Sequence, residues 1–171
     1  MDSLTQILLG GAVGAIVGGR KYGRKSVLLG AICGTIPDMD VLFLIGDDPI
    51  TSLTSHRGFS HSILFSILAI PVFSWLFSKI KWFAVSLRDK EIHWIVFLGL
   101  LTHMLLDSLT IYGTQLFWPL PSAPVGIGSV FIIDPLYTLP LAFGVVWFLI
   151  NKSMHAVRVA IVVSTAYLVW G

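Results

Sequence analysis

The sequence predicts an all-α, polytopic bundle of transmembrane helices, and three observations lead to this fold class. Of the 171 residues, 56% are hydrophobic and only 12% are charged, and the mean hydropathy is +0.88. A soluble domain carries about 25% charged residues, so this chain has too few polar side chains to face water on all sides. The apolar residues gather into about five to six membrane segments, and the polar loops between them carry the reactive side chains on one face.

A helix that crosses the hydrocarbon core needs about 20 mostly apolar residues. Six segments are candidates in order along the chain: residues 4–19, 26–36, 61–77, 92–109, 135–150 and 156–170. The first is short and rich in Gly and Ala, and Ser3 and Gln6 stand at capping-box spacing at its start. The second is interrupted at Pro37, and Ser60 is a candidate cap for the third.

Small residues and turn residues complete the expected architecture. Glycines such as Gly10, Gly14, Gly30 and Gly34 predict a close approach of the first two helices, because small residues favour helix packing in lipid. Residues 112–130 hold three prolines and three glycines and predict a loop or a broken hairpin. Cys33 is the only cysteine, so no internal disulfide is expected, and it is interpreted as a buried thiol.

We expect one domain over residues 1–171. Asp2 precedes the first apolar segment and the basic residues follow it, so this segment is interpreted as a retained membrane segment rather than a secretory signal. The sequence ends within an apolar run, which fits either a natural end or the N-terminal part of a longer protein.

The charged residues alternate between the loops. Ten of the 11 Lys and Arg residues fall on alternate loops and share one side of the predicted bundle, which the positive-inside rule assigns to the cytoplasm. They are Arg20, Lys21, Arg24, Lys25, Lys79, Lys81, Arg88, Lys90, Lys152 and Arg158. The opposite, extracytoplasmic side receives seven ligand-type residues from distant parts of the chain: Asp38, Asp40, His56, His61, His103, Asp107 and Asp134.

Two of the motifs that carry these residues lie in turns. Pro37 frees the local backbone for a turn that carries Asp38 and Asp40, for which solvated acids at a helix end are the alternative. His56 and His61 lie five residues apart, so a loop must bring them together. They are interpreted as metal ligands or as surface and capping residues.

Arg57 is the only cation expected on the site face. Either it pairs with an aspartate or it holds an anionic substrate group such as phosphate.

The other two motifs lie on helices. His103 and Asp107 share one helix face at i, i+4 spacing, which suits two ligands of one metal, a carboxylate that orients a metal-bound histidine, or a plain hydrogen bond between side chains. Asp134 precedes Pro135 and is interpreted equally as a metal ligand or as a helix cap.

Three His and four Asp suit a borderline or hard divalent ion, and the absence of a thiolate on that side disfavours a cysteine zinc site. One or two ions are expected, most readily Zn²⁺, with Mn²⁺ or another divalent ion as the alternative. Such a site activates water, and a carboxylate of Asp38 or Asp40 that does not bind metal serves as general base.

These motifs resemble those of the YdjM-type membrane-bound metal-dependent hydrolases. The resemblance rests on residues 1–6, 36–40, 56–62, His103 with Asp107, residues 112–115 and residues 133–135, so it spans nearly the whole chain. It implies a multi-pass protein of a bacterial or archaeal inner membrane, more distantly similar to zinc-dependent phospholipase C and P1 nuclease. Many members of that family carry His where this chain has Gln6.

The expected function is hydrolysis of a phosphoester in a membrane lipid or another amphipathic substrate, with no nucleic-acid partner. A metal-independent lipid phosphatase also uses His-x-x-x-Asp, but its upstream Arg and its Pro-Ser-Gly-His element are missing here. The remaining alternatives are a divalent-metal transporter or carrier, with ligands near the bilayer midplane, and a non-enzymatic membrane protein with a structural metal.

Overall fold

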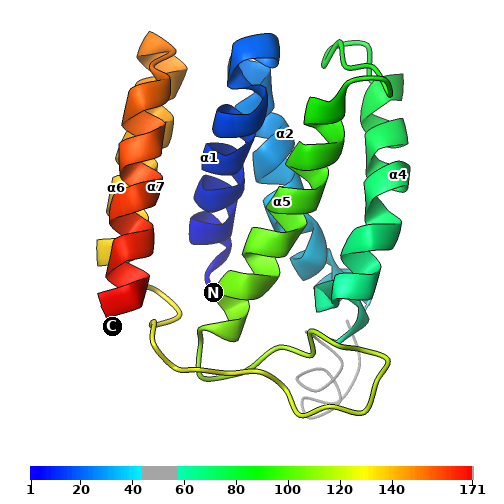
Figure 1. Cartoon of the computed structure of the whole chain (residues 1–171), viewed down its shortest axis with the longest axis vertical. Helices are drawn as coiled ribbons and strands as arrows, with labels where there is room; N and C mark the ends of the chain where they lie inside the picture. The colour runs from blue at the N-terminus through cyan, green and yellow to red at the C-terminus, as the bar shows by residue number, and fades with distance from the viewer. Residues whose placement is uncertain (44–57, 171) are drawn as a thin grey trace.

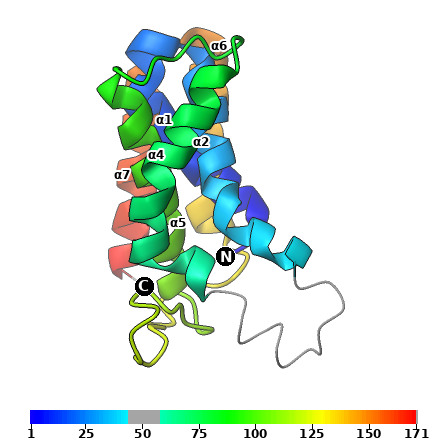
Figure 2. The ribbon, with the colours of Figure 1, turned by 90° about the vertical axis from the view of Figure 1, so that its right-hand side faces the viewer.

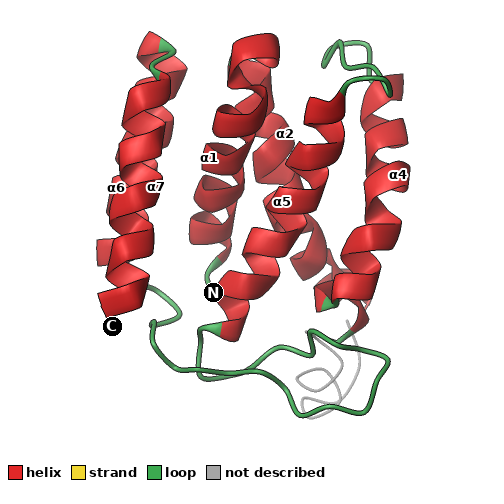
Figure 3. Ribbon diagram, viewed as in Figure 1, coloured by secondary structure: helices red, strands yellow, loops and turns green. Residues whose placement is uncertain are grey.

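The computed structural model describes residues 1–43 and 58–170, and in this part the extended secondary-structure elements are all helices, joined by loops (Figure 3). Its α-helices are α1 (Ser3–Tyr22), α2 (Arg24–Thr35), α4 (Ile63–Lys79), α5 (Lys90–Ser108), α6 (Pro135–Asn151) and α7 (Met154–Trp170). Two 3-10 helices, η1 (Ile36–Phe43) and η2 (Phe59–His61), lie between α2 and α4. The all-α prediction is confirmed, and each of the six predicted apolar segments is a helix.

The helices stand side by side as an elongated bundle (Figure 1). The α6–α7 pair forms one edge and α4 forms the other, with α1, α2 and α5 between them. Within residues 1–43 and 58–170, no helix combines the length and the apolar character needed to cross a membrane. The membrane segments are therefore confirmed as helices, while their crossing of a bilayer stays a prediction.

Glycines set the contact between α1 and α2. A Cβ atom on Gly30 would lie 2.1 Å from the carbonyl oxygen of Gly10, and one on Gly34 would lie 2.6 Å from that of Gln6. The two backbones thus touch directly, as the small residues predict. The close contact fixes α2 against α1 and leaves the end of α2 beside α5.

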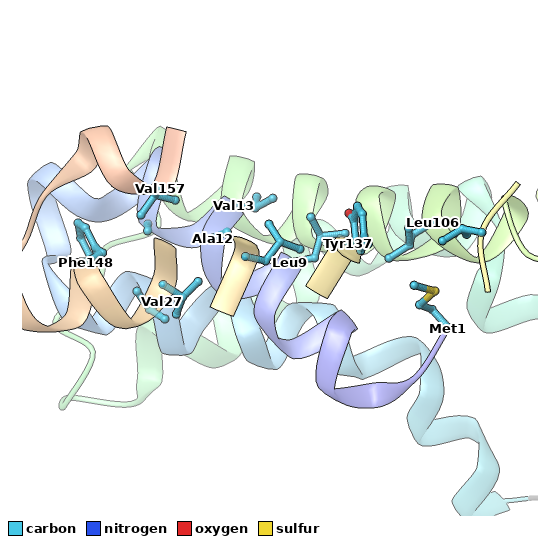
Figure 4. Close-up of a cluster of buried hydrophobic side chains, with 13 residues drawn as sticks. Met1, Leu9, Ala12, Val13, Val27, Leu106, Tyr137, Phe148 and Val157 are labelled. Carbon is cyan, nitrogen blue, oxygen red and sulfur yellow. The ribbon is translucent and has the colours of Figure 1, made fainter. Parts of the chain in front are cut away.

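Two apolar clusters hold the bundle together. The first joins α1 to α6 and α7 through side chains such as Leu9, Phe148 and Val157 (Figure 4). The second joins α2, α4 and α5 and includes Cys33, which is fully buried as predicted. Because α1 and α2 pack on each other, both clusters support a single rigid frame.

The two ends of the bundle differ in character. The connections α1–α2, α4–α5 and α6–α7 lie at one end of the bundle (Figure 1). The ten Lys and Arg residues that were predicted to share one side lie on these connections or on the adjoining helix turns. The N-terminus, the two 3-10 helices and the long connection between α5 and α6 lie at the opposite end (Figures 1 and 2). In that connection, Thr114 and Val125 exchange backbone hydrogen bonds of 2.8 and 2.9 Å, which makes a broken hairpin as expected.

Candidate metal centre

The end of α2 places the first carboxylates. Pro37 follows the last turn of α2, and the chain continues as the tighter helix η1, which carries Asp38 and Asp40. Proline lacks an N–H donor and disfavours a preceding α-helical residue, so the change of helix type at this point follows from the sequence. The side chains of Asp38 and Asp40 are 20% and 19% exposed.

Helix η2 places His61. The His61 N–H donates to the Gly58 carbonyl at 3.1 Å, and this turn holds the imidazole in the interior with no exposed surface. The prediction that Ser60 caps the next helix is wrong, because Ser62 is the N-cap and its Oγ accepts from the Phe65 N–H at 3.1 Å. Ser60 is instead free to bind the side chains beside it.

Helix α5 supplies the other two ligand-type residues. His103 and Asp107 lie one turn apart on its buried face. Gly99 lets α5 approach α2 closely, because a Cβ there would lie 2.7 Å from that of Cys33. This approach brings the His103 ring to Gly34, whose carbonyl oxygen accepts a hydrogen bond from Nδ1 at 2.6 Å.

The four side chains Asp38, His61, His103 and Asp107 converge on one point. Their ligand atoms all lie within 4.8 Å of one another, and no other group of this kind forms among the residues that the structure describes. Nε2 of His61 lies 3.4 Å from Asp38 Oδ1 and 3.5 Å from Asp107 Oδ2. Nε2 of His103 lies 3.4 and 3.6 Å from the same oxygens, and the two Nε2 atoms are 3.2 Å apart.

The hydrogen bonds behind the two imidazoles assign their protons. The Gly34 carbonyl can only accept, so Nδ1 of His103 carries a proton. The Ser60 hydroxyl donates to Asp40 Oδ2 at 2.5 Å, so it accepts from Nδ1 of His61 at 2.9 Å. Both Nε2 atoms then present lone pairs to the centre, as metal-binding histidines do when the other ring nitrogen is held by a second partner.

Two imidazole nitrogens and two carboxylate oxygens that face one another favour positive charge between them, either a proton or a metal ion. A tetrahedral ion with ligand distances of about 2.0–2.1 Å separates its ligand atoms by about 3.3–3.4 Å. The five separations given above, 3.2 to 3.6 Å, match those edges. The donor set and these five separations therefore fit a divalent metal ion.

Hydrogen bonds to its outer oxygen fix the carboxylate of Asp107. Its Oδ1 accepts a hydrogen bond from Gln6 Nε2 at 3.0 Å and from the amino group of Met1, while Oδ2 faces the histidines. Gln6 also donates to the His103 carbonyl at 3.3 Å. These contacts fix which oxygen of Asp107 points into the centre, and they give Gln6 a role as a supporting donor.

The ionisation of the cluster follows from its geometry. Burial raises the pKa of Asp38, but hydrogen bonds from His103 and His61 outweigh burial and hold that pKa well below its usual value. Burial lowers the pKa of His61, but the carboxylates of Asp107 and Asp38 outweigh it and raise that pKa above its usual value. The cluster thus favours positive charge at its centre, which a proton or a metal ion can supply.

Other predicted site residues lie apart from these four. Asp40 binds Ser60 at 2.5 Å, and its Oδ2 lies 3.8 Å from Nδ1 of His61, so it stands behind the imidazole. Asp134 caps α6, where Oδ1 accepts from the N–H groups of Leu136 and Tyr137, and Oδ2 accepts from the Tyr167 hydroxyl at 2.9 Å.

Asp2 caps α1 by accepting from the Thr5 N–H at 3.0 Å, which confirms its interpretation as a helix cap rather than a ligand at the rim of the site. Ser3, which the capping-box spacing suggested as the cap, is the first residue of the helix. His56 and Arg57 lie outside the described residues.

Two supporting groups were not predicted. The Gly34 carbonyl carries no signal in the sequence, because every residue has one. Ser60 stands beside His61, yet a contact between adjacent side chains depends on the 3-10 turn, which the sequence does not reveal.

The sequence profile of the YdjM inner membrane protein family matches the chain over residues 1–171. The chain is 28% identical over 161 residues to the uncharacterized protein YfhP of Bacillus subtilis (strain 168), a match that covers 86% of this chain and 46% of YfhP. It is 32% identical over 109 residues to the inner membrane protein YbcI of Escherichia coli (strain K12), covering 64% and 61% of the two chains. The chain therefore spans about half to three-fifths of these relatives. No solved structure matches it.

Proposed function

The chain belongs to the YdjM inner membrane protein family, and on that premise we propose that it is a membrane-bound metal-dependent hydrolase. Its substrate is a phosphoester of a lipid or another amphipathic molecule. One observation carries the proposal: the ligand atoms of four side chains, Asp38, His61, His103 and Asp107, all lie within 4.8 Å of one another. Similarity to zinc-dependent phospholipase C stays a prediction from the motifs.

In this proposal, His61, His103 and Asp107 form the buried part of the metal site and Asp38 its accessible edge. A divalent ion bound there, Zn²⁺ by preference and Mn²⁺ as the alternative, supplies Lewis acidity and lowers the pKa of water towards neutrality. Ser60 links the carboxylate of Asp40 to the His61 ring and keeps its Nε2 directed at the centre.

Catalysis needs an exchangeable position, because catalytic zinc sites have three protein ligands and an open fourth. Asp38 is 20% exposed, whereas the side chains of the other three are at most 2% exposed. We propose that Asp38 moves aside for the substrate and accepts a proton from the attacking water as general base. Arg57 completes the proposal as the partner of the phosphate group.

The surface around the centre supports an amphipathic substrate. Phe59 lies two residues before His61, is 46% exposed, and meets the exposed ring of Trp118 edge-on at 5.1 Å. Exposed apolar side chains continue along the connection between α5 and α6, where Phe131 and Ile133 are 78% and 72% exposed. Such a surface suits contact with acyl chains beside a polar headgroup site.

The membrane orientation is part of the proposal. We infer a multi-pass protein with the basic end of the bundle in the cytoplasm and the metal centre on the extracytoplasmic side. The alternation of basic loops with ligand-bearing turns, and their separation to opposite ends of the bundle, supports it.

A structural metal site in a non-enzymatic membrane protein is the second candidate. It is favoured by the four-residue ligand set, because four protein ligands fill a tetrahedral shell as in structural zinc sites. A metal carrier is less well supported, because the centre lies at one end of the bundle rather than near its middle.

The test measures zinc content and hydrolysis on the same purified protein in detergent. Phosphatidic acid, phosphatidylglycerol and a polyprenyl phosphate serve as substrates, before and after chelation and zinc readdition. We expect zinc-dependent release of a phosphorylated headgroup or phosphate, and a decrease of about 10²-fold or more in the Asp38→Asn variant. Full zinc occupancy without hydrolysis of any of these substrates would reject the hydrolase and leave the structural site.

A further inference from the structure

A second binding surface lies between α4 and α5, away from the metal centre and towards the basic end. Two hollows adjoin there and share His93. One holds about 730 Å³ and is lined by Pro71, Val72, Trp75, Leu87 and His93, and the other holds about 300 Å³ and is lined by Ile70, His93, Trp94 and Phe97. We call the two together the α4–α5 groove. Its size falls in the range of small-molecule sites.

Internal contacts keep the floor of the groove in place. The Leu87 carbonyl accepts from Nε2 of His93 at 2.9 Å, and the Ser74 hydroxyl lies 2.9 Å from Nδ1. His93 thereby joins α4, α5 and the loop between them. Pro71 removes one backbone donor from α4 at the groove wall.

The walls of the α4–α5 groove are apolar and open to the outside. Val72, Trp75 and Trp94 are 53%, 48% and 53% exposed. Indole rings at the end of a helical bundle suit the interfacial layer of a membrane, where one side of the ring meets acyl chains and the other meets headgroups.

Positive charge surrounds the mouth of the groove. Lys79 Nζ lies 5.4 Å from the centre of the Trp75 ring, and Arg88 follows the groove residue Leu87. The neighbouring acid, Asp89, is already paired with Lys21 at 2.6 Å and bound by the Tyr22 hydroxyl at 2.8 Å. Lys21 also lies 3.2 Å from Glu91, so three cations, Lys21, Lys79 and Arg88, stand against the two acids Asp89 and Glu91. The net charge of these five residues is positive and favours an anionic partner.

We propose that the α4–α5 groove binds an anionic phospholipid, with an acyl chain along Val72, Trp75 and Trp94 and the phosphate at Lys79 and Arg88. Basic clusters beside membrane helices recognise anionic headgroups in this way. The long stems of Lys and Arg reach along apolar surface while their charges stay at the headgroup level. This site is independent of the metal centre and of any hydrolase activity.

The test uses the full chain in bilayers and the fluorescence of its own tryptophans. Phospholipids with brominated acyl chains quench an indole that they touch, so the quenching by brominated phosphatidylglycerol is compared with that by brominated phosphatidylcholine. The Trp75→Phe/Trp94→Phe variant assigns the signal to the groove. We expect phosphatidylglycerol to be preferred by about tenfold, and the preference to vanish with that variant.

Charge variants distinguish a specific binding site from general attraction to an anionic surface. In the Lys79→Gln/Arg88→Gln variant, the ratio of quenching by phosphatidylglycerol to quenching by phosphatidylcholine should fall close to one. The control variant, Lys152→Asn/Arg158→Gln, removes the same charge from the α6–α7 edge, and Asn tolerates the left-handed backbone at residue 152. The control should keep the preference.

Three results would overturn the proposal. The first is equal quenching by the two lipids. The second is an equal loss in the two charge variants, which indicates a diffuse field rather than a site. The third is no quenching of the groove tryptophans by either lipid together with cross-links between copies, which indicates that a second chain covers the groove.

Discussion

The Nε2 atoms of His61 and His103 lie 3.2 Å apart, although 42 residues separate the two histidines in the chain. Each ring directs its Nδ1 to a different acceptor, Ser60 for His61 and the Gly34 carbonyl for His103. The two lone pairs therefore meet at the same point as the carboxylates of Asp38 and Asp107. This arrangement leads to three predictions, and the contact between α1 and α2 leads to a fourth.

Replacing either histidine should remove the metal. We expect about one zinc ion per wild-type chain and only background zinc in His61→Ala and His103→Ala, because the one imidazole and two carboxylates that remain bind zinc more weakly than the full set of four. Elemental analysis of the purified proteins measures this. His155→Ala is the control, since His155 is exposed on α7. Unchanged zinc in both site variants would contradict the metal centre.

Ser60, which links Asp40 to His61 by hydrogen bonds, should increase the affinity of the site for metal. Loss of a partner that orients a metal-bound histidine weakens binding by about 10- to 100-fold, and we expect this for Ser60→Ala and Asp40→Asn. The double variant should match the single ones, because both residues act through one chain of hydrogen bonds. Competition with a chromophoric chelator measures the affinities.

Ser78→Ala is the matched control for that series, since Ser78 binds a backbone carbonyl at the other end of α4. If Asp40→Asn weakened binding while Ser60→Ala did not, Asp40 would be a direct ligand and the chain of hydrogen bonds would be wrong.

Metal affinity should rise with pH. Burial lowers the pKa of His61, but Asp107 and Asp38 raise it above its model-peptide value of 6.5. In the metal-free chain the protonated ring stabilises the fold fully below that value, and this contribution is lost as the pH rises through the higher folded-state pKa. Zinc must displace the same proton, so apparent affinity increases up to that pKa and then levels off.

Titration calorimetry in two buffers of different ionisation enthalpy counts the released protons between about pH 6 and about pH 8. We expect proton release that decreases towards the upper end of this range. Zinc binding with no proton release anywhere in it would show that the ring is already neutral.

The contact between α1 and α2 should not tolerate a side chain at Gly30. The Cβ of Gly30→Ala would meet the Gly10 carbonyl oxygen at 2.1 Å, and backbone on both sides must shift. We expect a loss of about 1–3 kcal/mol, read as a lower temperature of thermal unfolding. Gly11→Ala is the control, because the tightest contact of its Cβ is with the side chain of Val27 at 3.2 Å, and its nearest backbone atom is the Val27 carbonyl oxygen at 3.6 Å. Equal stability of the two variants would reject the close packing.

The sequence predicted the helices well because apolar segments and helix breakers mark them directly. Pro37 ends α2, and Asp134 with Pro135 begins α6, as the local rules for proline and N-caps require. The error at Ser60 has a physical cause, since Ser62 is also a good N-cap and the intervening 3-10 turn decides between them.

The sequence predicted only that Asp38, His61, His103 and Asp107 lie on the same face of the bundle, and not that these four side chains meet. Alternating loops bring residues to the same end, but they do not say which ones touch. The selection of four depends on the close approach of α2 to α1 and α5, which Gly30 and Gly99 permit. From its residue type, Asp134 was an equally good candidate ligand, and in the structure its carboxylate caps α6.

The single accessible edge of the metal centre governs how the site exchanges its ion. His61, His103 and Asp107 are fixed by the helices and by their supporting hydrogen bonds, whereas only Asp38 borders the outside. If the cluster binds a metal as proposed, an ion would enter and leave past one carboxylate while the bundle stays folded. The site would then load after the chain has folded, and its occupancy would depend on the free metal concentration on the side that Asp38 faces.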